Sequence, residues 1–204
     1  MIENNILGTI LAGGKSRRFG FDKSTVKLGD KTLLDHTLDK IVNKFSEILV
    51  VTNNNDIKIN KRNIFLINDC IKGQLGPLVG VLSAMNWIKE NKKKYSWIAT
   101  FPCDTPFFNI SAVDELIKKS IDGNKKLYFL RSGDKRHNIF GIWSLKLRDT
   151  LEEDIKKKFR KVEDWANKIG LETINIDNKK HGNFININTK KEFEEAEQQF
   201  TKLK

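Results

Sequence analysis

Two adjacent glycines and four cationic side chains follow the first apolar run of the chain, and together they could hold a polyphosphate. Gly13 and Gly14 can adopt positive φ, which lets backbone N–H groups approach a ligand without a Cβ in the way. Charged donors on such a loop suit phosphate oxygens, and the cations that follow are Lys15, Arg17, Arg18 and Lys23. The spacing is not that of a Walker A loop, whose leading glycine would have to stand at Thr9, and no G-x-G-x-x-G occurs.

Three further polar residues each follow a short apolar run that is typical of a buried strand. They are Asn53, Asp69 and Asp104, after the runs at residues 48–51, 64–67 and 97–101. In an open α/β sheet, ligands bind outside the carboxyl ends of the strands, so these side chains and the glycine loop are expected to face one crevice. Asparagine and aspartate also favour turns for purely local reasons, and that alternative stays open for Asn53 and Asp69.

Asp104 is the best candidate for a metal ligand. Pro102 and Pro106 flank it and stiffen its loop. A carboxylate at a strand end suits Mg²⁺ when substrate phosphates supply the other ligands, and a helix-capping aspartate is the alternative. Cys103 is expected to be a packed thiol rather than a nucleophile, because no histidine partner is evident.

The composition favours acidic partners such as nucleotides. The 37 Lys and Arg residues exceed the 26 Asp and Glu residues by 11 in a chain of 204 residues. The lysines are scattered and no recognised nucleic-acid module accompanies them, so we expect no nucleic-acid partner. Cys70 and Cys103 form no C-x-x-C, which leaves no indication of a zinc site or a disulfide framework. Without a signal peptide or a long apolar run, we expect no membrane partner and a cytoplasmic location.

Strand-like and helix-like segments alternate, which predicts an α/β fold: a Rossmann-like three-layer sandwich with a mostly parallel, mixed sheet. No linker or composition break divides the chain, so residues 1–204 are predicted to form a single domain. The expected strands cover residues 6–10, 48–51, 64–67, 97–101, 126–130 and 139–143. The expected helices cover residues 32–45 and 77–91, start at Ser111 and Thr189 with capping-box pairs, and place Leu147, Leu151, Ile155 and Phe159 on one face.

Four motifs together resemble the MobA-type nucleotidyltransferase family, which includes the molybdenum cofactor guanylyltransferases. The longest, L-A-G-G-x-S-x-R-x-G-x-D-K, is carried by Leu11, Ala12, Gly13, Gly14, Ser16, Arg18, Gly20, Asp22 and Lys23. The others are similar to the C-D-x-P, G-P-L-x-G and F-x-N-x-N-T elements of the family, at residues 103–106, 76–80 and 184–189. The resemblance spans nearly the whole chain and implies a nucleotide-diphospho-sugar transferase type of fold.

The resemblance implies transfer of GMP from GTP to the terminal phosphate of molybdopterin or Mo-molybdopterin, with Mg²⁺ as cofactor and Asp104 as the metal ligand. The implied catalytic residues are Arg18, Lys23 and Asp104. The implied nucleotide-binding residues are Leu11, Ala12, Gly13, Gly14, Lys15, Lys23, Asn53, Asp69, Gly76, Pro77, Leu78, Gly80 and Asp104. Molybdenum-insertion and molybdoenzyme-maturation proteins are the further partners that it implies.

Acceptor binding is assigned to Asn186, Asn188 and Arg160, with Lys161 beside the last. The two amides alternate with Ile185 and Ile187, so both are expected on one face of a strand.

Some positions depart from the family pattern. Asn138 follows His137 where the family often has proline, which puts an acceptor role of His137 in doubt, and Lys190 replaces a proline after Thr189. Gly13 stands where the related cytidylyltransferases usually have alanine, which leaves room for a purine and favours GTP. The alternatives are a molybdopterin cytidylyltransferase, a sugar- or alditol-phosphate nucleotidyltransferase, and a non-catalytic nucleotide-binding protein.

Overall fold

A mixed sheet forms the centre of the molecule in the computed structural model, which describes residues 5–13, 23–73, 75–177 and 184–202. Within these residues, seven strands lie in the order β5-β4-β1-β6-β8-β7-β9. Only β8 runs antiparallel to its neighbours, which confirms the predicted mostly parallel, mixed sheet. The strands are β1 (Ile6–Leu11), β4 (Ile48–Val51), β5 (Ile64–Ile67), β6 (Trp97–Pro102), β7 (Leu127–Ser132), β8 (Lys135–Ser144) and β9 (Glu172–Asn175).

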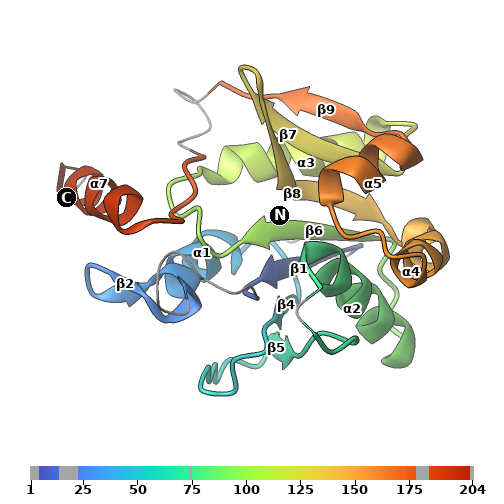
Figure 1. Cartoon of the computed structure of the whole chain (residues 1–204), viewed down its shortest axis with the longest axis horizontal. Coiled ribbons are helices and arrows are strands. Elements are labelled where there is room, and N and C mark those ends of the chain that lie inside the picture. The colour runs from blue at the N-terminus through green and yellow to red at the C-terminus, as the bar shows by residue number, and fades with distance from the viewer. Residues whose placement is uncertain (1–4, 14–22, 74, 178–183, 203–204) are drawn as a thin grey trace.

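Helices cover both faces of the sheet and complete the three layers (Figure 1). Side chains of α1 (Leu33–Ile41) and α3 (Ile110–Asp122) share one apolar core with the sheet. Those of α2 (Pro77–Glu90), α4 (Arg148–Lys156) and α5 (Val162–Ile169) belong to the core on the opposite face. The 3-10 turn η2 (Leu145–Leu147) links β8 to α4. In the part of the chain that the structure describes, no helix is both long and apolar enough to span a membrane.

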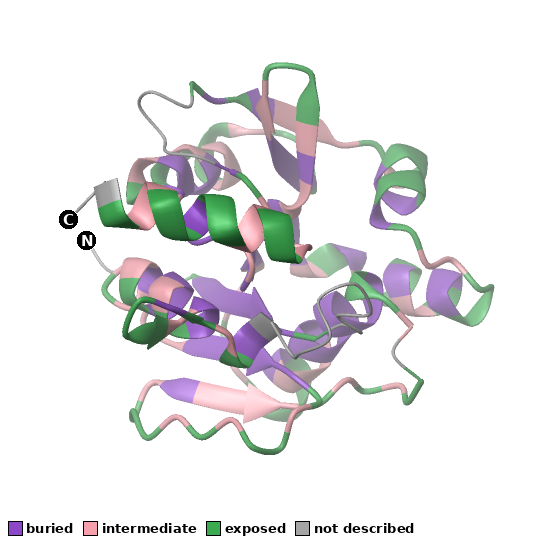
Figure 2. Ribbon diagram, turned by 60° about the vertical axis from the view of Figure 1, so that its left-hand side comes forward, coloured by how far each residue is buried: buried purple, intermediate pink, exposed green. Residues whose placement is uncertain are grey.

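Strand β1 contributes to both cores because successive side chains point to opposite faces. Ile6 and Ile10 pack in the first core, and Leu7 and Leu11 pack in the second. All four residues of β4 are buried as well, as expected of a strand covered on both sides. Figure 2 shows this distribution, with purple strands inside and green helical surface outside.

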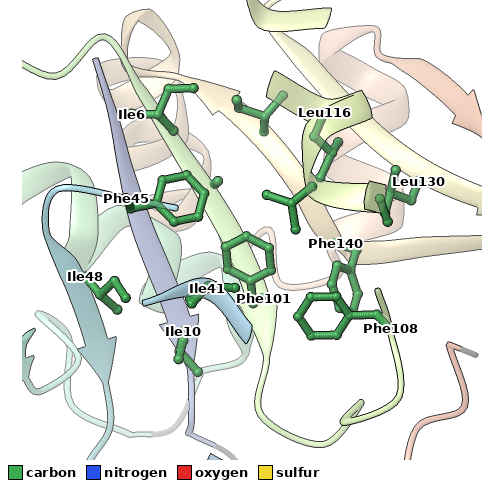
Figure 3. Close-up of a cluster of buried hydrophobic side chains, with 14 of the residues drawn as sticks. Ile6, Ile10, Ile41, Phe45, Ile48, Phe101, Phe108, Leu116, Leu130 and Phe140 are labelled. Atoms are coloured by element: carbon green, nitrogen blue, oxygen red, sulfur yellow. The ribbon is translucent and has the colours of Figure 1, made fainter. Parts of the chain in front are cut away.

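An aromatic cluster anchors the loop that leaves β6 (Figure 3). Phe101 precedes this loop and Phe108 follows most of it, and their stacked rings lie 6.0 Å apart. The ring of Phe140 from β8 meets that of Phe108 edge-on at 4.9 Å. Because both ends of the loop are packed in this way, the position of Asp104 between them is set by the core.

A smaller unit lies beside the sheet. It consists of the turn η1 (Lys23–Thr25), the two-stranded hairpin β2 (Lys27–Leu28) and β3 (Lys31–Thr32), and the C-terminal helix α7 (Lys190–Lys202). Thr32 caps α1 through a capping box with Asp35. Figure 1 shows α7 and β2 together at the left of the molecule.

The predicted strands at residues 48–51 and 64–67 have the observed bounds, and Pro77 is the first residue of α2 as expected. Three helix predictions are wrong in detail. Helix α1 ends at Ile41, and Phe45 reaches the core from the following turn. Helix α3 begins at Ile110 after the N-cap Asn109, so Ser111 does not cap it. The apolar face that ends at Phe159 is divided among η2, α4 and the segment after α4, because apolar spacing does not reveal where a helix stops.

Candidate active site

The candidate site lies at the carboxyl ends of β1 and β6, where the order of the strands reverses. Leu11 and Pro102 are paired at the ends of these neighbouring strands. From β1 the chain proceeds through α1 to β4 on one side, whereas from β6 it proceeds through α3 toward β7 on the other side. Such a switch point is where open α/β sheets bind ligands. The segments that begin at Ala12 and at Cys103 therefore flank the crevice.

The expectation that four strand ends meet at one edge is confirmed. Strands β5, β4, β1 and β6 are adjacent and parallel, so the residues that follow them emerge at the same edge. The N–H of Ala12 donates to the carbonyl of Val51 at 2.9 Å and joins the start of the glycine loop to β4. Gly13 is exposed, and a Cβ added to it would have no heavy atom of the described residues within 4 Å.

Several predicted phosphate ligands cannot be placed. Gly14, Lys15 and Arg18 lie outside the described residues. Lys23 begins η1, but its side chain lies outside the described part of the chain.

Asn53 and Asp69 form a pair across the ends of β4 and β5. The Nδ2 of Asn53 donates to Oδ2 of Asp69 at 2.7 Å, and the backbone N–H of Asp69 donates to Oδ1 of Asn53 at 3.0 Å. Partial burial raises the pKa of the Asp69 carboxyl above its usual value, although the hydrogen bond from Asn53 opposes the shift. A purely local turn role does not account for these bonds, which join residues 16 positions apart. The local role belongs to Asn54, whose Oδ1 accepts from the N–H of Asp56.

The start of α2 packs directly on this part of the site. A Cβ at Gly80 would lie 3.1 Å from Cδ2 of Leu11 and 3.7 Å from Oδ1 of Asp69, so glycine allows a close approach there. Gly76 has a φ of +94°, which favours glycine, and it precedes Pro77 at the first position of the helix. The structure thus brings the predicted residues of the G-P-L-x-G element together with Leu11 and Asp69.

Asp104 is joined directly to the predicted acceptor segment. The N–H of Ile187 donates to the backbone carbonyl of Asp104 at 2.9 Å. The hydroxyl of Thr105, which is fully buried, donates to Oδ1 of Asn186 at 3.1 Å. Asn188 follows, with its Nδ2 at 3.5 Å from the carbonyl of Asn186. The candidate metal ligand and the candidate acceptor residues, more than 80 positions apart in the chain, are therefore neighbours in space.

The predicted strand at residues 184–189 is wrong, since residues 184–188 form no helix or strand. Ile187 is fully buried whereas Ile185 is 42% exposed, so the two isoleucines do not share an inner face. The segment is attached through Asp104 and Thr105 instead of a strand ladder, and strict alternation needs the ladder. The expected cap at Thr189 is confirmed, because its hydroxyl accepts from the N–H of Glu192 at 3.2 Å.

Arg160 contacts the end of α4 and the turn that precedes α2. Its guanidinium donates to the carbonyls of Ile155 and Phe159 at 2.8 and 2.7 Å and so closes the end of α4. A Cβ at Gly76 would lie 3.4 Å from the carbonyl oxygen of Arg160. The structure places the backbone of this arginine next to the predicted nucleotide-binding turn at the start of α2.

The donor atoms near the crevice suit a metal that brings most of its ligands with the substrate. Among the residues that the structure describes, no three or more His, Cys, Asp or Glu side chains are grouped to hold an ion. A single carboxylate such as Asp104 is the usual protein contribution when Mg²⁺ is held between phosphates.

Two contacts behind the acceptor segment were not predicted. One is the hydrogen bond from Thr105 to Asn186. No sequence pattern around Thr105 indicates this role. His137 is the other: its ring lies 4.8 Å from that of Phe184, and its Nε2 lies 2.7 Å from Oγ of Ser132. Burial and the charge of nearby Lys135 lower the pKa of His137 to about 4, so the ring is neutral at pH 7.

The fold and the site together define a nucleotide-binding α/β protein. Its parallel strands end at a switch point, and a glycine loop, an amide–carboxylate pair and a further aspartate follow them. Comparison with known proteins makes this class more specific. The chain belongs to the nucleotidyltransferases of the MobA-like NTP transferase domain family, whose model matches residues 8–169.

Curated relatives support the same family. The chain is 30% identical to the molybdenum cofactor guanylyltransferase of Haemophilus influenzae (strain 86-028NP), over 90% of this chain and 93% of the relative. It is 27% identical to that of Nitrobacter hamburgensis, over 93% of this chain and 92% of the relative. It is 34% identical to that of Rhizobium rhizogenes, over 74% of this chain and 71% of the relative.

Solved structures share the fold. The chain is similar to the molybdopterin-guanine dinucleotide biosynthesis protein A of Archaeoglobus fulgidus, with a TM-score of 0.80 and 21% identity over 96% of this chain and 99% of that one. It is also similar to the 2-C-methyl-D-erythritol 4-phosphate cytidylyltransferase of Francisella tularensis, with a TM-score of 0.70 and 20% identity over 96% and 99% of the two chains. The predicted nucleotidyltransferase type of fold is therefore confirmed.

Proposed function

We propose that this chain transfers GMP from GTP to the terminal phosphate of molybdopterin or Mo-molybdopterin, with release of pyrophosphate and formation of molybdopterin guanine dinucleotide. The observation that carries the proposal is the junction of Asp104, Thr105 and Asn186 at the switch point, which brings the proposed metal ligand next to a proposed acceptor amide. The substrates follow from relatives, named molybdenum cofactor guanylyltransferase, that are 27–34% identical to this chain.

The reaction needs alignment and charge neutralisation more than acid–base chemistry. A terminal phosphate is already an anion near neutral pH, so no protein base has to create the nucleophile. The difficulty is to bring two polyanions together and to stabilise the pyrophosphate that leaves. The N–H groups of Gly13 and Gly14, with the cations Lys15, Arg18 and Lys23, would hold the triphosphate.

Asp104 would hold Mg²⁺ together with phosphate oxygens of the nucleotide. When bound there, the ion supplies positive charge where negative charge develops during phosphoryl transfer. Because the backbone carbonyl of Asp104 is engaged by Ile187, the carboxylate is carried on a loop that is fixed on the acceptor side as well. Because the proposed mechanism needs Mg²⁺, chelation with EDTA should abolish transfer, and added Mg²⁺ should restore it.

The remaining residues divide between the two substrates. Asn53, Asp69, Gly80 and the turn at residues 76–78 line the nucleotide side, where Asp69 can accept from N–H or O–H groups of a base or ribose. Asn186 and Asn188 are assigned to the acceptor. Arg160 is assigned to the acceptor's phosphate; its backbone lies next to Gly76, and its guanidinium would have to leave the carbonyls of Ile155 and Phe159 to reach that phosphate.

Pyrophosphate release tests the proposal. GTP, CTP, UTP and ATP are each supplied in saturating Mg²⁺, with and without molybdopterin. We expect release from GTP only when molybdopterin is present. Release that instead requires a sugar phosphate or alditol phosphate would contradict the proposed acceptor, and nucleotide binding without turnover under any condition would indicate a non-catalytic protein.

A molybdopterin cytidylyltransferase is the second candidate, and Gly13 distinguishes it from the first. A Cβ at Gly13 would meet no atom of the described residues within 4 Å, so we expect Gly13→Ala to leave the melting temperature unchanged, and with that control a kinetic effect reports on the nucleotide. If the missing methyl group makes room for guanine, the ratio of kcat/KM for GTP to that for CTP should fall about tenfold, a change of about 1.4 kcal/mol. An unchanged ratio would show that Gly13 does not select the base.

We also infer that residues 1–204 act as one domain, with nucleotide binding in the N-terminal part and acceptor binding in the C-terminal part. The reaction implies molybdenum-insertion and molybdoenzyme-maturation proteins as partners, since these would supply its substrate or consume its product.

A further inference from the structure

A third apolar core lies away from the two that cover the sheet. Leu28, Leu33, Ile187 and Ala196 form its buried centre, and their side chains are at most 3% exposed. Four partly buried side chains pack around them: Val26, Phe107, Phe193 and Phe200. The contributing segments are far apart in sequence, and each of three lies next to a residue of the proposed site.

The first segment follows Lys23. Val26 and Leu28 enter the core directly after the turn η1 that Lys23 begins. The ring of His36 fixes this hairpin, since its Nε2 lies 2.8 Å from the carbonyl oxygen of Leu28. Phe200 covers it: its ring meets that of His36 edge-on at 5.3 Å, and a Cβ at Gly29 would lie only 2.6 Å from its Cε1. Phe200 therefore packs on the backbone of the hairpin itself.

The second and third segments belong to the metal and acceptor side. Phe107 stands three positions after Asp104 in the loop between β6 and α3. Ile187 stands between Asn186 and Asn188, is fully buried, and donates its N–H to the carbonyl of Asp104. The third core thus contains residues that lie within a few positions of Lys23, Asp104 and the pair Asn186 and Asn188, the groups proposed to bind phosphate, metal and acceptor.

Helix α7 closes this core with one face. Phe193, Ala196 and Phe200 are spaced three and four positions apart and lie on the same side of the helix. The hydroxyl of Thr189 caps the helix directly after Asn188, and Oε2 of Glu192 accepts from the N–H of Asn188 at 2.8 Å. The match to the family model ends at residue 169, before this helix.

We propose that α7 is a positioning element of the active site, which holds the Lys23 segment, the Asp104 loop and the Asn186–Asn188 segment in register through its face of Phe193, Ala196 and Phe200. The inference rests on the proposed function for the identity of the two substrates. Phe200 is the positioning residue to test, because it touches the hairpin that follows Lys23. Its influence on catalysis would pass through the backbone that carries the proposed ligand-binding side chains.

The test compares Phe200→Ala with Gln198→Ala, a matched change at an exposed position of the same helix. For both variants, kcat, KM for GTP, KM for molybdopterin and the affinity for GTP by calorimetry are measured well below the melting temperature. Since small misplacements of positioned groups are expensive in rate, we expect Phe200→Ala to lose roughly tenfold to a hundredfold in kcat/KM for GTP. Gln198→Ala should match the parent, and Phe200→Leu should recover a large part of the loss.

A purely stabilising role predicts a different result. Phe200→Ala would then lower the melting temperature and leave kcat, KM and GTP affinity unchanged below it, which would overturn the proposal. If Phe200→Ala does not fold, Phe200→Leu decides the matter by the same measurements, with an expected loss of about threefold in kcat/KM from a smaller cavity. If the parent protein releases no pyrophosphate with GTP and molybdopterin, the proposed function fails. The role of α7 is then still tested by the GTP affinity of Phe200→Ala: an affinity lower than that of the parent supports it, and an unchanged affinity refutes it.

Discussion

The two halves of the sheet build their parts of the site by different means. In the half made of β5, β4, β1 and β6, each polar residue comes shortly after a parallel strand, and the strand carries it to the crevice. On the side of β8, where His137 packs on Phe184, no strand among the described residues directly precedes Asn186 or Asn188. They lie on a segment attached by a bond from Ile187 to the Asp104 carbonyl and by the Thr105 hydroxyl.

The difference shows what each kind of construction depends on. On the nucleotide side the parallel strands bring Asn53 and Asp69 to the same edge of the sheet, where they bond to each other across 16 positions of the chain. The acceptor side depends on contacts between residues more than 80 positions apart. Substitutions on the nucleotide side and on the acceptor side test whether the two sides act separately.

Asp104 belongs to both halves and should give the largest effect. Asp104→Asn keeps the shape and the backbone bond to Ile187 but removes the charge that would hold Mg²⁺. We expect kcat for pyrophosphate release to fall by about a thousandfold or more, as for loss of other groups that stabilise transition-state charge. Circular dichroism should show an unchanged fold. Activity near that of the parent in saturating Mg²⁺ would contradict the metal assignment.

Asn53 and Asn186 should separate the halves by substrate. Asn53→Ala removes the partner of Asp69 and should raise KM for GTP about tenfold, with KM for molybdopterin unchanged. Asn186→Ala should do the reverse. Initial rates over both substrate concentrations distinguish the two patterns, and a loss of GTP affinity in Asn186→Ala as large as in Asn53→Ala would mean that the halves are not separate.

His137 should make the acceptor half sensitive to acid. Its folded pKa of about 4 lies below its ordinary value of 6.5, so the unfolded chain takes up a proton that the folded protein does not. The contribution to stability is therefore complete above pH 6.5 and is lost progressively as the pH falls from 6.5 to about 4. Chemical denaturation across this range should show a smaller decline in His137→Gln, which removes the titration. Identical pH profiles would show that His137 does not cause the decline.

Thr9 should give the smallest effect, in the nucleotide half and on stability alone. Its hydroxyl on β1 is fully buried and has no hydrogen-bond partner among the residues that the structure describes. Thr9→Val keeps the shape and removes the unsatisfied group, so the free energy of unfolding should rise by about 1 kcal/mol. Urea denaturation measures it, with KM for both substrates as the control. A lower stability would show that the hydroxyl has a favourable interaction.

Sequence reasoning succeeded where the signal was local. The bounds of β4 and β5, the start of α2 at Pro77 and the cap at Thr189 all follow from apolar runs, proline geometry and capping chemistry within a few residues. It failed where distant residues decide. Phe45 has the spacing of a helical core residue but packs after α1 has ended, and Ile185 and Ile187 alternate as in a strand that does not form.

By itself the sequence determined the α/β class, the order of the buried strands along the chain and the residues that follow each of them, because these depend on local periodicity and on the rule that sheet ligands bind at carboxyl ends. Only the tertiary structure decided that β1 and β6 lie side by side, that Asn186 meets Thr105 beside Asp104, and that α7 packs with Leu28 and Ile187 in a third core. Those are contacts between distant segments. Their free energy comes from burial and hydrogen bonds that exist only once the chain has folded.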